Sequence, residues 1–289
     1  MKETLLIIVL FLLAGCTSPD SDSKKTSVVP EKVQASITIP TVSDTTLSFV
    51  LGEFENSVII KMPKTTFKGT ILVLQGWNFP NTSWRDSSNL EKLASDAGFA
   101  LVMPGMGKSI YHKRNYPETR KDWRKFPTRT WLMDTLIASM RKDFGLFSKD
   151  HKNFVMGLST GGRGAFILAQ ENPEVFTAGS SLSGDYDQDA FPADNLYRGY
   201  FGSNPDNWSD DENPVSFVKN WSIPMYVAHG SKDSIVSIAH HQRLEEVMAN
   251  SGISTDGWKF STDATAGHDY QFWAAQTPLV INYFFSFTE

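Results

Sequence analysis

The sequence is poor in cysteine, in net positive charge and in long apolar runs. Its 289 residues contain one cysteine, Cys16, so no disulfide can form within the chain. The formal net charge of −5 argues against general nucleic-acid binding, which needs a basic surface to neutralise phosphates. Hydrophobic residues make up 40% and charged residues 20% of the chain, which indicates neither a disordered protein nor one with several membrane spans.

The longest apolar run lies near the first residue. Residues 4–13 form a nearly unbroken apolar segment after Lys2, of signal-peptide length and too short to span a bilayer comfortably. The run ends in Leu13-Ala14-Gly15-Cys16, which resembles the lipobox of bacterial lipoproteins. The resemblance implies a signal peptide over residues 1–15 and lipid attachment at Cys16, with an ordinary cleaved signal as the alternative. We therefore expect an exported protein anchored to a membrane of a bacterial cell envelope. Thr17 follows the cysteine at the position where an aspartate often marks retention in the inner membrane, which mildly favours the outer membrane.

The rest of the chain divides into a short polar segment and a long domain. Residues 16–32 are rich in Ser, Asp and Lys and cannot bury enough apolar surface to fold, so we interpret them as a tether. Residues 33–289 suit one large α/β domain in length. In that domain β-type runs alternate with helical patterns, which predicts a mainly parallel eight-stranded sheet with helices on both faces.

The expected elements follow from these patterns. We expect strands at residues 46–54, 57–62, 70–75, 99–103, 153–156, 177–182, 225–229 and 258–261. We expect helices at residues 88–97, 129–144, 162–171, 238–250 and 270–285. Two long connections remain, 104–128 and 184–221, and connections of that length in compact domains are usually functional.

A serine lies in the strongest motif of the sequence. Residues 153–165 read NFVMGLSTGGRGA and contain G-x-S-x-G, centred on Ser159, between an apolar strand and a helix. Glycines at 157 and 161 permit the sharp turn that exposes such a serine. The hydroxyl would lie at a helix N-terminus, which favours developing negative charge. We therefore expect Ser159 to be a nucleophile.

A serine nucleophile needs a base, and a carboxylate that orients the base. Of the six histidines, His268 lies after the last expected strand, where the chain order serine, acid, histidine places the base. Asp233, just beyond the strand at 225–229, is the expected acid, and Asp185 is its alternative. We expect His229 to pack or hydrogen-bond near the site. We expect solvated structural roles for the other histidines: His112, His151, His240 and His241.

Two backbone N–H groups should bind the oxyanion, one from the residue after the nucleophile and one from the loop after the third strand. We expect these to be the N–H groups of Thr160 and Trp77. For the second donor, Gly76 and Asn78 remain as alternatives.

These stretches together resemble the esterase D group of α/β-hydrolases, which includes S-formylglutathione hydrolases, feruloyl and acetyl-xylan esterases, and mycolyltransferases. The matching stretches are residues 72–77, 102–104, 157–164, 172–176, 201–202, 229–236, 267–269 and 272–273. The resemblance implies the α/β-hydrolase fold, hydrolysis of carboxylic esters and the triad Ser159, Asp233 and His268. Gln75 stands where many relatives have histidine and Thr160 where methionine is frequent, which leaves the substrate class open.

No metal and no cofactor is expected. The sequence has no H-E-x-x-H and no paired cysteines, and we interpret the acidic run at 206–212 as a solvated turn because it lacks the pattern of a calcium loop. The segment 108–129 carries eight Lys or Arg and is either a solvated face or a surface for anionic glycans. Its aromatic residues would supply stacking surfaces: Tyr111, Tyr116, Trp123 and Trp131.

The sequence predicts a serine esterase that acts on a small-molecule or glycan ester through an acyl-enzyme. The expected envelope location and the tryptophans in expected loops favour a carbohydrate esterase that removes acetyl or feruloyl-type groups. Those tryptophans are Trp77, Trp84, Trp123, Trp208 and Trp221. The alternatives are a serine peptidase or thioesterase with the same triad, and a non-catalytic glycan-binding surface lipoprotein.

Overall fold

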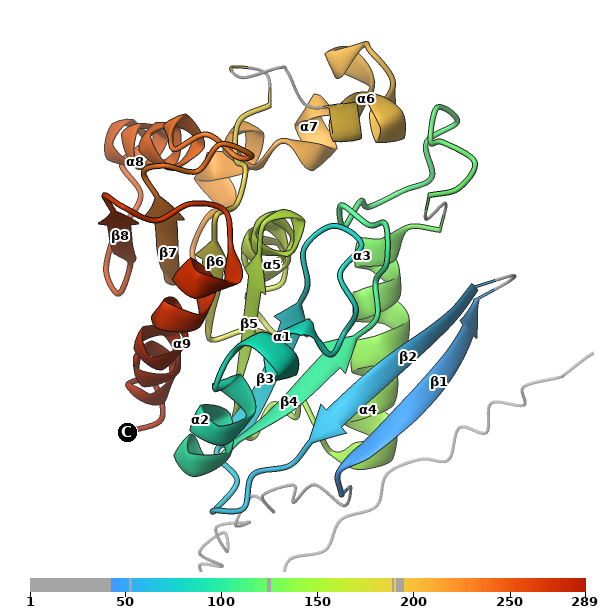
Figure 1. Ribbon diagram of the computed structural model, residues 1–289, viewed down its shortest axis with the longest axis vertical. Coiled ribbons are helices and arrows are strands. Elements are labelled where there is room, and N and C mark those ends of the chain that lie inside the picture. Colours follow the sequence, from blue (N-terminus) through green and yellow to red (C-terminus); the bar gives the residue numbers. More distant parts are fainter. Residues whose placement is uncertain (1–42, 52–53, 124–125, 189, 191–194) are drawn as a thin grey trace, which may run out of the picture. The chain divides into compact units, whose positions relative to one another are not determined.

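The alternating runs of the sequence form a single sheet with helices on both faces in the computed structural model of the protein (Figure 1). The structure describes residues 43–51, 54–123, 126–188, 190 and 195–289. The expected signal peptide, the tether and Cys16 lie outside the described residues. Within the described part, no helix is long and apolar enough to cross a membrane.

Every expected strand is present, with ends that differ by three residues or fewer. The strands are β1 (Thr45–Leu51), β2 (Phe54–Lys61), β3 (Gly69–Leu74), β4 (Phe99–Pro104), β5 (Lys152–Leu158), β6 (Ala178–Leu182), β7 (Met225–Gly230) and β8 (Lys259–Asp263). They lie in the order β1-β2-β4-β3-β5-β6-β7-β8. The pairs β1–β2 and β2–β4 are antiparallel and the other pairs are parallel. The carboxyl ends of β3, β5, β6 and β7 therefore share one edge, where α/β sheets build their sites.

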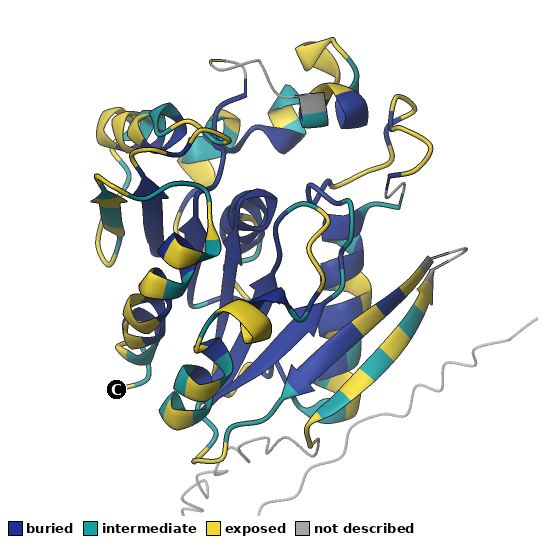
Figure 2. Cartoon of the chain, viewed as in Figure 1, coloured by how far each residue is buried: buried dark blue, intermediate teal, exposed yellow. Residues whose placement is uncertain are grey.

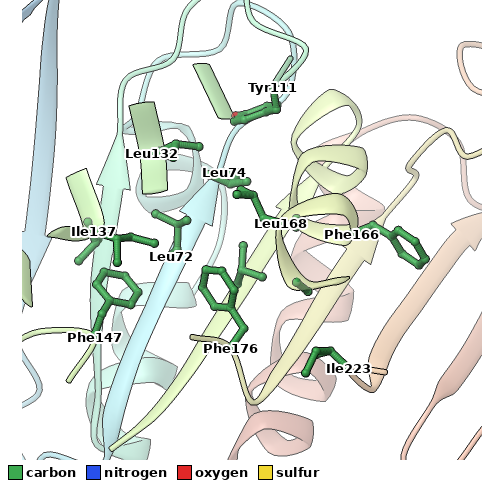
Figure 3. Close-up of a cluster of buried hydrophobic side chains, with 14 of the residues drawn as sticks. Leu72, Leu74, Tyr111, Leu132, Ile137, Phe147, Phe166, Leu168, Phe176 and Ile223 are labelled. Atoms are coloured by element: carbon green, nitrogen blue, oxygen red, sulfur yellow. The ribbon is translucent and has the colours of Figure 1, made fainter. Parts of the chain in front are cut away.

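The two faces of the sheet have separate apolar cores. One core is made with α3 (Thr128–Trp131), the π-helical turn η1 (Leu132–Ile137), α4 (Ala138–Phe144), α5 (Thr160–Glu171) and α8 (Ala239–Ser251). The other is made with α1 (Ser83–Ser87), α2 (Leu90–Ala97) and α9 (Tyr270–Phe285). Because side chains alternate along a strand, Leu72 and Leu74 of β3 face the first core and Ile71 and Val73 the second. Figure 3 shows part of the first core, and Figure 2 shows how fully the central strands are buried.

The connection 184–221 contains short helices that the sequence did not predict. They are α6 (Asn195–Phe201), η2 (Pro205–Asn207), α7 (Ser209–Glu212) and η3 (Pro214–Asn220). A third apolar cluster joins this connection to the connection 104–128 through Ile110, Tyr116, Trp123, Tyr197, Tyr200, Phe201 and Trp208. The two long connections are therefore packed against each other.

Candidate active site

Ser159 lies at the turn from β5 to α5. Its φ of 54° and ψ of −126° are unusual for a residue with a side chain. The turn is tight, because a Cβ on Gly157 would lie 2.1 Å from the carbonyl oxygen of Gly161. The N–H of Ser159 donates to the carbonyl of Leu182 on β6 over 2.8 Å. This strained turn places the hydroxyl at the N-terminus of a twelve-residue helix.

Two side chains from distant parts of the chain complete a hydrogen-bonded line with Ser159. His268 Nε2 lies 2.9 Å from Ser159 Oγ, and His268 Nδ1 lies 2.6 Å from Asp233 Oδ2. Asp233 follows β7. His268 precedes α9, whose first turn is capped by Asp269 through the N–H of Phe272. The structure thus brings together the three side chains that the motif and the chain order single out.

The carboxylate of Asp233 is buried and accepts several hydrogen bonds. Its Oδ1 accepts the N–H groups of Ile235 at 2.9 Å and Val236 at 2.8 Å. Burial disfavours its charged form, but the imidazoles of His229 and His268 and the N–H of Val236 outweigh burial and hold the pKa of Asp233 well below its usual range. Asp233 is therefore ionised beside His268 and can stabilise positive charge on that ring.

The alternative acid, Asp185, has other partners. Its Oδ2 accepts hydrogen bonds from the amide of Gln188 at 3.0 Å and from the hydroxyl of Tyr197. In the described part of the chain, the structure records no contact between Asp185 and His268. Of the two carboxylates considered from the sequence, Asp233 is the one paired with the base.

The loop after β3 lies against the nucleophile. A Cβ on Gly76 would come within 3.3 Å of the Cβ of Ser159. The loop is held in place by the buried hydroxyl of Tyr111, which donates to the carbonyl of Gln75 over 2.7 Å. A donor from this loop is therefore available close to Ser159.

Of the three loop residues considered as oxyanion donors, Asn78 is already engaged. Its N–H donates to the carbonyl of Gly107 over 3.0 Å. For the described residues, the structure records no hydrogen bond from the N–H of Trp77 or of Thr160. Thr160 opens α5, where the first N–H groups have no partner within the helix. The geometry leaves Thr160 and Trp77, or its neighbour Gly76, as the pair that could bind an oxyanion.

An exposed aromatic ring stands beside these groups. Phe79 is 36% exposed, and its Cδ2 lies 3.4 Å from the point where a Cβ on Gly76 would stand. The ring contacts those of Tyr270 and Trp273, with centroids 5.8 and 6.4 Å away. Trp273 in turn meets His268 edge-on at 5.0 Å. This side of the site offers apolar surface to a substrate.

Four of the five tryptophans in the expected loops do not offer stacking faces to a substrate. Trp84, Trp123, Trp208 and Trp221 are at most 6% exposed. Tyr111, Tyr116 and Trp131, suggested as stacking surfaces, are buried as well. Large aromatic rings supply much apolar area, and here they fill cores. Only Trp77 among the five loop tryptophans is half-buried.

The basic segment and the acidic run meet in the interior at Glu212. The side chain of Glu212 is fully buried, and its Oε2 lies 3.1 Å from both Arg129 Nη1 and Arg163 Nη2. Its Oε1 accepts the N–H of Lys113 at 2.7 Å. Burial disfavours the charge of Glu212, yet the two arginines hold its pKa below the usual range. The expectation of a solvated acidic turn is therefore wrong at Glu212, which ties both long connections to the first turns of α5.

Three histidines expected in solvated roles are buried, so that expectation is wrong for His112, His240 and His241. Burial lowers the pKa of both His112 and His241 to about 4. His151 is half-buried with its ring 4.7 Å from that of Phe67. His229 packs beside the site as expected. Among the described residues, no group of three His, Cys, Asp or Glu side chains is placed to hold a metal ion.

The chain is similar to known esterases in sequence and in structure. The family model described as "Putative esterase" matches residues 58–278. The acetyl esterase of Caldicellulosiruptor saccharolyticus is 24% identical over 222 residues, which are 71% of this chain and 78% of the relative.

Solved structures extend the similarity to nearly the whole described part. The S-formylglutathione hydrolase of Agrobacterium tumefaciens has a TM-score of 0.68 at 16% identity, covering 83% of this chain and 94% of its own. A ferulic acid esterase has a TM-score of 0.63 at 16% identity, covering 86% of this chain and 99% of its own. These likenesses establish the α/β-hydrolase fold that the sequence predicted.

Proposed function

Because this chain belongs to the esterase family matched over residues 58–278, we propose that it hydrolyses carboxylic esters through an acyl-enzyme formed on Ser159. The observation that carries the proposal is the line of two contacts, 2.9 and 2.6 Å long, that joins Ser159, His268 and Asp233. Each contact is within hydrogen-bonding distance, and the buried acid is ionised.

The reaction follows from these positions. Ser159 Oγ attacks the ester carbonyl while His268 Nε2 takes its proton, and Asp233 stabilises the resulting imidazolium. The oxyanion of the tetrahedral intermediate accepts the N–H groups of Thr160 and Trp77. When the intermediate collapses, the C–O bond breaks and the alcohol leaves with the proton from His268. Water, deprotonated by His268, then attacks the acyl-enzyme and releases the acid and free Ser159.

A fluorophosphonate probe tests the proposed nucleophile. We expect the probe to modify the protein once, at Ser159. We also expect the unmodified protein to hydrolyse p-nitrophenyl acetate. Ser159→Ala should lose both labelling and turnover. Labelling at another residue, or undiminished turnover in Ser159→Ala, would contradict the proposal. Peptide anilides and acyl thioesters in the same assay distinguish an esterase from a peptidase or thioesterase.

For the substrate, we propose an acetyl or feruloyl-type ester of a carbohydrate. The proposal is supported by the similarity to an acetyl esterase and to a ferulic acid esterase, and by the apolar surface of Phe79 beside Ser159. Acetylated xylan, methyl ferulate and S-formylglutathione should be compared side by side. A clear preference for S-formylglutathione would overturn the substrate assignment and leave the acyl-enzyme mechanism standing.

For the location, we propose export and lipid attachment at Cys16, with the outer membrane slightly favoured. The support is the sequence Leu13-Ala14-Gly15-Cys16 after an apolar run. In a bacterial host, the full chain should incorporate labelled fatty acid and sediment with membranes, while Cys16→Ala should incorporate none. Equal labelling of both proteins would contradict attachment at Cys16.

A further inference from the structure

Asp233 contacts two imidazoles through the same oxygen. His268 Nδ1 lies 2.6 Å from Asp233 Oδ2, and His229 Nε2 lies 3.4 Å from that atom. His229 belongs to the end of β7, four residues before Asp233, and its side chain is fully buried. A triad mechanism uses only one of these two histidines as the base.

The proton position on His229 follows from a second contact. Its Nε2 lies 2.9 Å from the carbonyl oxygen of Val236, which can only accept a hydrogen bond. Nε2 therefore carries the hydrogen, and its N–H points into the space shared by the Val236 carbonyl and the Asp233 carboxylate. His229 Nδ1 is buried with no hydrogen-bond partner among the described residues.

Val236 also donates its own N–H to Asp233 Oδ1 at 2.8 Å. This bond closes the turn from Asp233 to Val236, and the bond from the His229 ring to the Val236 carbonyl closes the longer loop from His229 to Val236. Both closures fix the position of the carboxylate that orients His268.

On this basis, and resting on the proposed triad, we propose that His229 is a positioning residue that holds Asp233 and restrains the basicity of His268. An N–H near Oδ2 takes up part of the negative charge that would otherwise act on His268 alone. Without that N–H, Asp233 would stabilise the imidazolium of His268 more strongly and would also move more freely.

Among the described residues recorded against His229, Asp233 is the charged one. His241 of α8 has its ring 6.0 Å away, and burial lowers its pKa to about 4, so it is neutral near pH 7. Burial also lowers the pKa of His240, whose Nδ1 accepts the N–H groups of Tyr186 and Asp187. His240 and His241 should therefore not change charge around neutral pH, and a change in the pH profile there reports on His268.

The test compares replacements that keep or remove the donor. Glutamine places an amide N–H near the position of Nε2, asparagine has an amide too short to reach it, and leucine fills volume with no donor. For His229→Leu and His229→Asn, we expect kcat to fall roughly tenfold with KM within about twofold, and the acid limb of kcat/KM against pH to move up by about half a unit. His229→Gln should stay close to the wild type.

Two outcomes would overturn the inference. One is an acid limb that stays in place in His229→Asn and His229→Leu. The other is identical profiles for all three variants, which would indicate a packing role only. If leucine prevents folding, the comparison of glutamine with asparagine alone decides. Ser159→Ala in the same series separates the two proposals, because activity in that variant would refute the triad, whereas a flat His229 series with an inactive Ser159→Ala refutes only this inference.

Discussion

His268 Nε2 and Ser159 Oγ lie 2.9 Å apart although 109 positions separate the two residues in the chain. Each is held by its own local structure, Ser159 by the tight turn into α5 and His268 by the cap of α9. The contact therefore depends on the packing of α9 against the sheet, and its geometry reports on the integrity of the whole fold.

Removing members of the triad should cost activity in a defined order. Ser159→Ala and His268→Ala should each lower kcat by about 10⁴-fold to 10⁶-fold, and Asp233→Asn by less, because the acid acts through the base. Steady-state kinetics with p-nitrophenyl acetate measure the losses, and circular dichroism checks that the variants fold. Asp185→Asn is the comparison for the acid, and a larger loss there than in Asp233→Asn would reverse the assignment.

The buried pairing of Glu212 predicts a large loss of stability. Glu212→Gln removes the carboxylate that pairs with Arg163 and one of the two that pair with Arg129, so the free energy of unfolding should fall by about 3–5 kcal/mol. Urea denaturation measures the change. Asp96→Asn is the matched control, since the Asp96–Lys92 pair is exposed and should contribute less than about 1 kcal/mol. Equal effects of the two substitutions would show that the buried network contributes little.

Because His112 is buried, we expect the free energy of unfolding to fall in mild acid. Its pKa is about 4 in the folded protein, against about 6.5 when exposed, so between these values the unfolded chain binds more protons and stability falls as pH falls. The loss from this residue should reach about 2 kcal/mol at pH 5 relative to pH 7. Urea denaturation at both pH values should show a smaller difference in His112→Asn than in the wild type. The half-buried His151, replaced in the same way, serves as control, and a wild-type slope in His112→Asn would contradict the prediction.

We expect the apolar ring of Phe79 to contribute to substrate binding. Phe79→Ala removes apolar surface beside Ser159 and should raise KM for aryl esters by about threefold to tenfold, with a smaller effect on acetyl esters. Leu279→Ala is the control because Leu279, 49% exposed on α9, is also a large apolar side chain at the surface. Parallel changes in the two variants would indicate a general effect of lost apolar surface.

The sequence predicted those features that depend on local pattern. The strands are short apolar runs bounded by turn residues, and the G-x-S-x-G motif has few structural contexts. The helix expected at 129–144 is helical throughout but contains the π-helical turn η1, which has no signature in the apolar spacing. The short helices α6 and α7 were missed because elements of seven and four residues are too brief to show a helical period.

Other features depend on partners that are distant in the chain. The acidic run at 206–212 looked solvated because nothing in it shows that Glu212 meets Arg163, 49 positions away, and Arg129, 83 positions away. The burial of His112, His240 and His241 has no signature in the sequence for the same reason, since burial depends on what packs over a residue. The second contact of Asp233 with His229 had a visible signal, the strand-end position of His229 four residues before the acid.

The pairing of Glu212 with two arginines also constrains recombination between members of the family. Arg129, Arg163 and Glu212 come from three segments that are not adjacent in the chain, yet they share one buried carboxylate. A crossover between residues 129 and 212 joins one parent's arginine to the other parent's residue at 212. If that residue carries no carboxylate, the chimera buries the guanidinium of Arg163 without its paired carboxylate and should lose stability as Glu212→Gln does. Crossovers before residue 129 or after residue 212 inherit the three residues together and are the junctions at which shuffled chains should remain folded.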